Sequence, residues 1–149
     1  MPISTKEIFT GNLYNDCFRV FNREQWFAQG RLLADQMGLS ERSVVGQSVL
    51  DGGCGHGALV YRLLELGAKE AVGIDLKPAP PSGVFGRFPR ARFVEGSLLE
   101  LPFADNSFDS VVSSGVLHHT TDPERGFSEL VRVLRPGGRL VLGVYGKHG

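Results

Sequence analysis

The sequence predicts an α/β fold: a doubly wound, mainly parallel sheet of five strands with helices on both faces. Short apolar runs that suit buried strands alternate along the chain with amphipathic helical patterns. The first two runs end in carboxylates, Asp51 and Asp75, and a glycine-dense turn, 52–57, follows the first. Crossovers between parallel strands are right-handed, and in folds of this kind later strands are added to the opposite side of the first strand. We therefore expect the strand order 3-2-1-4-5.

An N-terminal segment, 1–44, precedes the sheet and is expected to be helical. Asn22 and Gln25 resemble a capping box, and a helix that starts there would end at Gly38. Its apolar positions are Trp26, Phe27, Leu33, Ala34 and Met37. The aromatic residues that would form either a lid over the site or a packing surface against the sheet are Tyr14, Phe18, Trp26 and Phe27.

A strand, a glycine turn and a helix open the main domain, 45–149. The strand is expected at 48–51 and the helix at 58–66, where apolar residues recur at three- and four-residue spacing. Gly67 stands where a helix C-cap would lie, and the second strand is expected at 71–75. This unit is typical of folds that bring a ligand against bare backbone at a helix N-terminus.

The second half of the domain supplies three more strands. Two are expected at 91–95 and 108–114, and a helix begins after the cap residue Asp122. The residues predicted to form the buried face of that helix are Phe127, Leu130, Val131 and Leu134. The turn 136–138 ends the helix, and the fifth strand is expected at 139–145.

Length and composition narrow the function classes. The 149 residues are enough for one domain with a sizeable core. Sixteen basic and sixteen acidic residues cancel, so no nucleic-acid partner is expected. No apolar run approaches the roughly 18 residues of a membrane span, and the N-terminus has no hydrophobic signal core. Cys17 and Cys54 do not indicate a disulfide framework, and we expect a cytoplasmic protein.

The glycine turn leaves two cofactor classes open. Gly53, Gly55 and Ala58 satisfy the pattern of dinucleotide-binding turns, and Asp75 lies about 20 residues further on, where an acid that binds ribose belongs. A nicotinamide-dependent oxidoreductase would fit this pattern. Asp51 argues against it, because a carboxylate repels a pyrophosphate, whereas it favours a cofactor that carries an ammonium and a sulfonium.

Residues 45–145 resemble a class I S-adenosylmethionine-dependent methyltransferase of the small-molecule and quinone-type group. The segments that carry the resemblance, in the family's order and at its spacing, are 49–57, 73–76, 96–103, 108–119 and 129–138. The resemblance implies a Rossmann-like fold, S-adenosyl-L-methionine as the cofactor and S-adenosyl-L-homocysteine as the product. It also implies methyl transfer by in-line displacement to a small organic acceptor.

The resemblance also implies a set of site residues. The residues it assigns to cofactor binding are Asp51, Gly52, Gly53, Gly55, Gly57, Asp75, Leu76, Ser97, Leu98, Ser114 and Gly115. The glycines would let the backbone approach the methionine moiety, and Asp51 would orient its amino group. Asp75 would accept both ribose hydroxyls. Leu76 and segment 97–98 would line the adenine pocket, and segment 114–115 would lie near the methyl group.

The chain departs from the family pattern in two places. Ser97 stands where the family often has Asp, and a hydroxyl accepts from the adenine amine more weakly than a carboxylate does. The family's domain normally continues through two more strands, whereas this sequence ends at Gly149. The fifth strand would then be an open edge. Three explanations stay open: a fragment of a longer protein, self-association with another copy through that edge, or a natural minimal form.

One residue is a candidate for catalysis. His119 follows the fourth strand beside His118, and it would act as the base if the acceptor must lose a proton. The histidine pair would otherwise be a structural feature of the loop. Adjacent histidines without a third ligand do not make a metal site, so none is expected. A cofactor-binding module or an inactive partner subunit stays open as an alternative to an enzyme.

Overall fold

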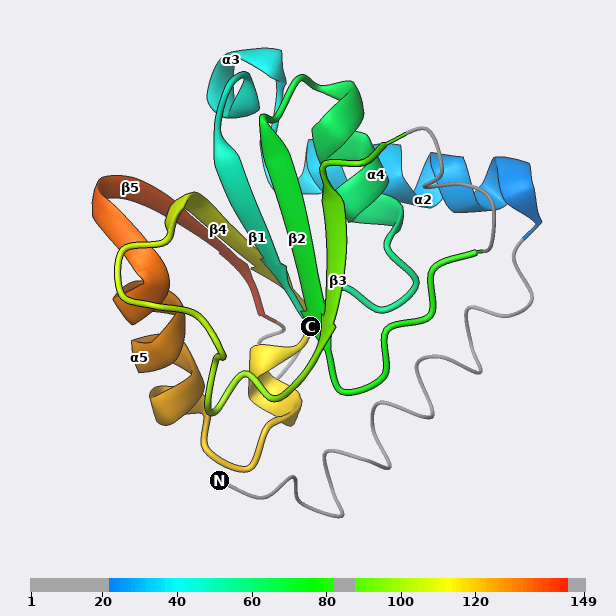
Figure 1. The fold of residues 1–149 in the computed structure, drawn as a ribbon. Coiled ribbons are helices and arrows are strands. Elements are labelled where there is room, and N and C mark those ends of the chain that lie inside the picture. The colour runs from blue at the N-terminus through cyan, green and yellow to red at the C-terminus, as the bar shows by residue number, and fades with distance from the viewer. Residues whose placement is uncertain (1–21, 82–87, 145–149) are drawn as a thin grey trace.

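The computed structural model of the protein describes residues 22–81 and 88–144, which contain a five-stranded parallel sheet. The strand order is β3-β2-β1-β4-β5 (Figure 1), so the predicted fold class and order are confirmed. The strands are β1 (Ser48–Gly52), β2 (Glu70–Asp75), β3 (Ala91–Glu95), β4 (Phe108–Ser114) and β5 (Leu134–Gly143). Tyr14, Cys17, Phe18 and Tyr145 lie outside the described residues, and so do the roles predicted for them.

Helices cover both faces of the sheet (Figure 1). The helices α2 (Arg23–Gln36) and α4 (Ala58–Glu65) pack together on one face, and α5 (Pro123–Val133) lies on the other. Successive strand residues therefore enter two cores: Val49 packs in the core under α4, and Leu50 packs in the core under α5. Every residue of β1 is buried, including Ser48 and Asp51 on either side of its apolar pair, as expected of a strand covered on both faces.

The start of α2 is set by the predicted capping box. The Gln25 N–H donates to the Asn22 side chain at 2.8 Å, and the Asn22 N–H donates to the Gln25 side chain at 2.9 Å. The short helix α3 (Glu41–Val44), by contrast, has no signal in the sequence, because four residues cannot show an apolar period. Among the described residues, no helix has the length and apolar character needed to cross a membrane.

The boundary between α5 and β5 differs from the prediction. The helix ends at Val133, and Leu134 already belongs to β5, where it pairs with Phe108 of β4. The turn residues 136–138, predicted to separate helix from strand, lie inside β5 at a shift of register between Phe108 and Ser110. A strand can accommodate a proline and glycines at such an irregularity, because the regular ladder of hydrogen bonds is already interrupted there.

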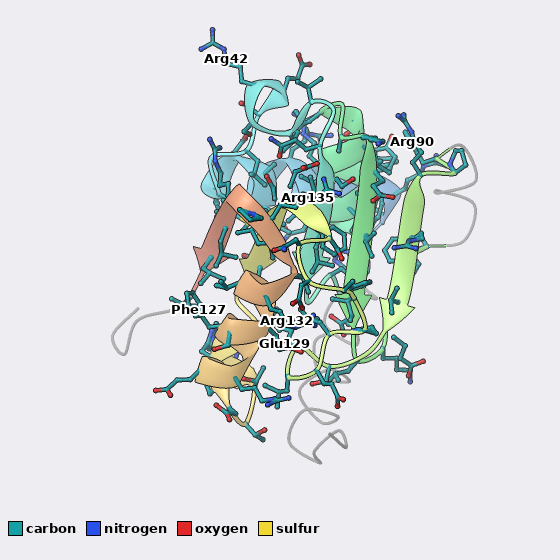
Figure 2. All side chains as sticks on the ribbon, turned by 60° about the vertical axis from the view of Figure 1, so that its left-hand side comes forward. Arg42, Arg90, Phe127, Glu129, Arg132 and Arg135 are labelled. Atoms are coloured by element: carbon teal, nitrogen blue, oxygen red, sulfur yellow. The ribbon has the colours of Figure 1, made fainter. Side chains whose placement is uncertain are left out.

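The buried face of α5 is narrower than its apolar pattern predicts. Leu130 is buried as predicted, together with Gly126 and Val133, which lie four residues before it and three residues after it. Phe127, labelled in Figure 2, and Val131 are 44% and 46% exposed. They lie one residue, about 100°, further round the helix than Gly126 and Leu130, and so point away from the sheet.

The strand β5 is the outer strand of the described sheet on its side, which agrees with the open edge that the sequence predicts. Val144, directly after it, is 56% exposed. Self-association through this edge stays a prediction. Light scattering on the purified chain would test it by giving the mass in solution.

Candidate functional site

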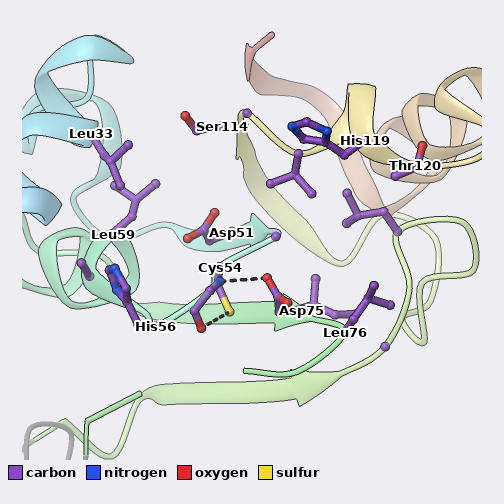
Figure 3. A pocket seen from close by; sticks show the side chains of 18 of the residues that line it. Leu33, Asp51, Cys54, His56, Leu59, Asp75, Leu76, Ser114, His119 and Thr120 are labelled. Atoms are coloured by element: carbon purple, nitrogen blue, oxygen red, sulfur yellow. Dashed lines mark hydrogen bonds between the residues drawn. The ribbon is translucent and has the colours of Figure 1, made fainter. Parts of the chain in front are cut away.

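A cavity opens at the carboxyl ends of β1, β2 and β4 (Figure 3). The two carboxylates that end the first two predicted strands, Asp51 and Asp75, both line it. The predicted site residues that line it are Asp51, Gly53, Gly55, Asp75, Leu76, Leu98, Ser114, Gly115 and His119. They come from the end of β1 and the turn after it, from the end of β2 and the loops after β2 and β3, and from the end of β4 and the segment after it. Residues far apart in the sequence thus meet in one place.

Three predicted site residues lie behind the cavity wall. Gly52 packs against Leu98, whose Cδ2 would be 3.1 Å from an added Cβ, and Gly57 is the N-cap of α4. The Ser97 hydroxyl accepts from the Leu99 N–H at 3.1 Å, and Ser97 is only 7% exposed. These residues shape the wall without lining the cavity, so their direct contact with a cofactor stays a prediction.

Helix α2 contributes two residues to the cavity that the sequence does not assign to the site. Gln29 and Leu33 line it beside Leu59 of α4 (Figure 3). The two helices approach closely because Gly30 has no side chain: an added Cβ would lie 2.4 Å from the Ala58 carbonyl oxygen. The other lining residues that were not predicted are Cys54, His56, Ala58, Ile74, Gly96, Val116 and Thr120.

Backbone hydrogen bonds hold the glycine turn against the end of β2. The N–H groups of Gly53 and Cys54 donate to the Ile74 carbonyl oxygen at 2.7 and 3.0 Å. The Gly55 N–H donates to Asp75 Oδ2 at 2.9 Å, and the Lys77 N–H donates to Asp75 Oδ1 at 3.2 Å. The Asp75 carboxylate is therefore held at the cavity by a backbone N–H on each oxygen.

Gly53 has no room for a side chain in the turn. Its φ of 85° favours glycine, and an added Cβ would lie 2.4 Å from Val116 Cγ2. Gly55 also has a positive φ, 54°, but an added Cβ would meet nothing within 4 Å. Gly55→Ala is therefore a matched control that introduces backbone strain without a clash.

We expect Gly53→Ala to lower the free energy of unfolding by about 2–4 kcal/mol, combining backbone strain with overpacking, and Gly55→Ala to lower it by about 1 kcal/mol. Urea unfolding of the two variants beside the parent measures both changes. Equal losses in the two variants would contradict the close packing of Gly53 against Val116.

Asp51 is the most perturbed carboxyl group in the cavity. It is 3% exposed, and burial raises its pKa to about 7, with a further contribution from Asp75. Within the part of the chain that the structure describes, no group donates a hydrogen bond to its side chain. A cationic group of a ligand would give this carboxyl the partner that these residues do not supply.

Two titratable groups next to Asp51, His56 and Cys54, add no positive charge. Burial lowers the pKa of His56 to about 4, so its ring is neutral at pH 7. Burial, reinforced by Asp51 and Asp75, raises the pKa of Cys54 well above its usual value, so the thiol stays protonated. None of the described residues that line the cavity is a lysine or arginine. The cavity is therefore electrostatically suited to a cation.

His119 lies on the wall formed by the 3-10 helix η2 (Leu117–His119), beside Thr120 (Figure 3). The backbone N–H of His119 donates to the Val116 carbonyl oxygen at 2.9 Å. The centroid of its ring lies 4.0 Å from that of the His118 ring. The structure therefore brings His119 to the same cavity as the two carboxylates.

Residues 50–142 match the protein family described as "Methyltransferase domain". The match runs from β1 to β5 and includes every cavity-lining residue except Gln29 and Leu33 of α2. The chain belongs to this methyltransferase family. The nicotinamide alternative thereby loses its support.

Two curated relatives and one solved structure illustrate the similarity of this methyltransferase domain. A demethylmenaquinone methyltransferase of Renibacterium salmoninarum is 34% identical over 128 residues, 86% of this chain and 51% of that protein. A tRNA U34 carboxymethyltransferase of Methylococcus capsulatus is 40% identical over 107 residues, 66% of this chain and 32% of that protein. The crystal structure of an S-adenosylmethionine-dependent methyltransferase from Mesorhizobium loti is 30% identical, with a TM-score of 0.60, over 67% of this chain and 47% of that one. The domain thus spans about half or less of the length of these proteins.

Proposed function

We propose that this methyltransferase domain binds S-adenosyl-L-methionine in the cavity and transfers its methyl group to a small organic acceptor. The observation that carries the proposal is the presence of two carboxylates, Asp51 and Asp75, in a cavity whose described lining residues include no lysine or arginine. The cofactor carries an ammonium and a sulfonium, so it would bring positive charge to two carboxylates that have no lysine or arginine among the described lining residues. Membership of the methyltransferase family supports the same cofactor.

Each part of the cofactor would meet residues suited to it. The turn 53–55 leaves bare backbone for the methionine moiety next to Asp51, which would bind the ammonium. The Asp75 oxygens would accept from the ribose hydroxyls, because each oxygen has room for a partner beyond the backbone N–H that it already accepts. The adenine would lie against Leu76 and Leu98.

When bound, the cofactor supplies an activated methyl group that an acceptor atom displaces in line from sulfur. The contribution of the chain is then mainly alignment and exclusion of water. Ser114 and Gly115, on the cavity wall at the end of β4, would lie beside the reacting methyl group. His119 would accept a proton from those acceptors that must lose one.

We propose that the acceptor is uncharged and partly apolar, such as a quinone-like ring. Leu33, Leu59 and Val116 give the cavity apolar walls, and the demethylmenaquinone methyltransferase is named for an acceptor of this class. The tRNA relative is named for a nucleic acid. Phosphates would meet two carboxylates without a lining cation among the described residues, and the chain has no net charge, so a small acceptor is favoured.

His119→Ala tests the catalytic part of this proposal. For an acceptor that loses a proton, we expect the rate to fall by about a hundredfold, the usual effect of losing a general base, while the affinity for S-adenosyl-L-methionine is unchanged. Release of S-adenosyl-L-homocysteine, followed with a panel of phenolic, quinol and amine acceptors, measures the rate. His118→Ala is the matched control and should retain activity.

Two results would count against this account. An unchanged rate in His119→Ala would remove the residue from the role of base. Binding of the cofactor without turnover on any acceptor would favour the alternative function, a cofactor-binding module or an inactive partner subunit.

A further inference from the structure

Charged side chains of α5 bind the backbone of the loop that leads from β3 to β4. Arg125 Nε donates to the Leu99 carbonyl oxygen at 2.7 Å. Arg132 Nη2 donates to the Leu101 carbonyl oxygen at 3.0 Å, and Arg132 Nη1 donates to the Phe103 carbonyl oxygen at 2.8 Å. Three carbonyl groups of an irregular segment, which has no strand partner, thus find their donors on one helix.

Glu129 completes this arrangement. Its Oε1 accepts from the Leu101 N–H at 3.0 Å, and its Oε2 accepts from Arg132 Nε. Figure 2 labels Glu129 and Arg132 side by side. Burial opposes ionisation of Glu129, but the hydrogen bonds from Arg132 and Leu101 hold its pKa below the usual value, so the carboxyl is ionised near pH 7. Arg132 also donates to Asp105 at 2.8 Å. The planar guanidinium of Arg132 therefore joins helix and loop in a charge-assisted network.

The loop bound in this way is also a wall of the cavity. It begins with Gly96 and Leu98, which line the cavity, and continues into Leu99 and Leu101, which are buried. The hydrogen bonds from α5 begin at Leu99, directly after the lining residues. Movement of the loop away from α5 would therefore displace Leu98 from the cavity.

We propose that Glu129 and Arg132 are positioning residues that hold the loop 96–105 so that Leu98 presents a formed surface to the adenine of the cofactor. The proposal rests on the proposed function, because it takes the adenine to lie at Leu98. Neither residue lines the cavity, so their effect on the cofactor is exerted through the loop. A site whose wall is held in place before binding need not order that wall when the ligand enters.

Arg135 provides a matched control on the same stretch of chain. It pairs with Asp109 at 2.6 Å, and Asp109 in turn accepts from the Ser48 N–H at 2.8 Å. Ser48 begins β1, so this ion pair lies at the end of the sheet remote from the cavity. Arg135 Nε also donates to the Asn106 carbonyl oxygen at 3.2 Å, at the end of the loop far from Leu98. Arg135→Ala therefore removes a charged pair and a loop contact, as Arg132→Ala does, but leaves the hydrogen bonds of segment 96–105 in place.

The test compares Arg132→Ala, Arg132→Lys, Glu129→Gln and Arg135→Ala with the parent. Calorimetric titration with adenosine and with S-adenosyl-L-homocysteine measures affinity, and amide hydrogen exchange without ligand measures protection of segment 97–103. For Arg132→Ala we expect faster exchange of that segment and about tenfold weaker binding, the change that loss of one charge-assisted hydrogen bond produces. The loss should be the same for adenosine and for S-adenosyl-L-homocysteine, because both carry the adenine.

Arg132→Lys should not restore affinity, since an ammonium cannot reach the separate acceptors that the planar guanidinium spans. Glu129→Gln should also weaken both affinities and speed the exchange of segment 97–103, by smaller factors than Arg132→Ala. Arg135→Ala should lower the melting temperature and leave both affinities and the exchange of segment 97–103 unchanged.

Unchanged affinity and exchange in Arg132→Ala would overturn the inference while leaving the proposed function intact. An equal loss of affinity in Arg135→Ala would also overturn it, because the effect would then follow general stability. If the folded parent binds neither adenosine nor S-adenosyl-L-homocysteine, the proposed function fails, and the inference fails with it. The titration of the parent therefore separates the two failures.

Discussion

Replacing Asp75 with alanine is expected to weaken binding of S-adenosyl-L-homocysteine by at least about a hundredfold. The carboxylate would accept from two ribose hydroxyls, and hydrogen bonds to a charged group contribute about 1.5–3 kcal/mol each. The alanine variant also loses the acceptor for the Gly55 N–H, which holds the glycine turn against β2. Both effects act on the same ligand, so this substitution should have the largest effect on affinity of any single change in the cavity. Titration calorimetry measures it directly.

Asp75→Asn separates the two contributions. Its side-chain oxygen can still accept from the Gly55 N–H, but it lacks the charge that two ribose hydroxyls would use. We expect an affinity between those of the parent and the alanine variant, with a melting temperature near that of the parent. Affinity in Asp75→Ala equal to that of the folded parent would remove Asp75 from the site.

Asp51→Asn is expected to stabilise the ligand-free protein, and to do so increasingly as the pH rises. Burial raises the pKa of Asp51 from 3.8 to about 7, so between these values the folded protein binds more protons than the unfolded chain. The stability of the parent is therefore lowered as pH rises through this window. The shift corresponds to about 4 kcal/mol, reached in full above the folded pKa.

The expected difference in the free energy of unfolding between Asp51→Asn and the parent is near zero at pH 3 and about 4 kcal/mol at pH 8. Urea unfolding of both proteins at several pH values measures it. His56, whose pKa is lowered to about 4, titrates in both proteins, so its contribution cancels in the difference. A difference that does not change with pH would show that the pKa of Asp51 is the same in the folded and the unfolded protein, and would contradict the shift caused by burial.

The same group should make cofactor binding depend on pH. An ammonium binds the ionised carboxylate, so the affinity of the parent for S-adenosyl-L-methionine should rise with pH through about 7, up to the pH at which the cofactor's own ammonium loses its proton. The asparagine variant should bind more weakly and without this rise. Parallel pH profiles in the two proteins would contradict the contact between Asp51 and the cationic part of the cofactor.

Much of the fold is predictable from the sequence because its strands are buried on both faces. Such strands are short apolar runs that end abruptly, and the runs before Asp51 and Asp75 show this clearly. Since the carboxyl ends of parallel strands share one edge of the sheet, the two carboxylates meet in the cavity without any further assumption.

The remaining features depend on tertiary contacts that no local pattern contains. Leu134 fits the apolar period of α5, yet its pairing with Phe108 draws it into β5. Leu33 fits a packing face of α2, yet the close approach of α2 to α4 at Gly30 makes it a wall of the cavity. Arg132 is a charged residue on a helix surface in the sequence, and only the fold shows that it binds the loop after β3.

The most direct test of the account is calorimetric titration of the folded, purified chain at pH 8 with S-adenosyl-L-homocysteine and, separately, with reduced nicotinamide adenine dinucleotide. The account predicts micromolar binding of S-adenosyl-L-homocysteine and no binding of the dinucleotide, whose pyrophosphate would meet the Asp51 carboxylate. A folded chain that does not bind S-adenosyl-L-homocysteine, or that binds the dinucleotide with similar affinity, would contradict it.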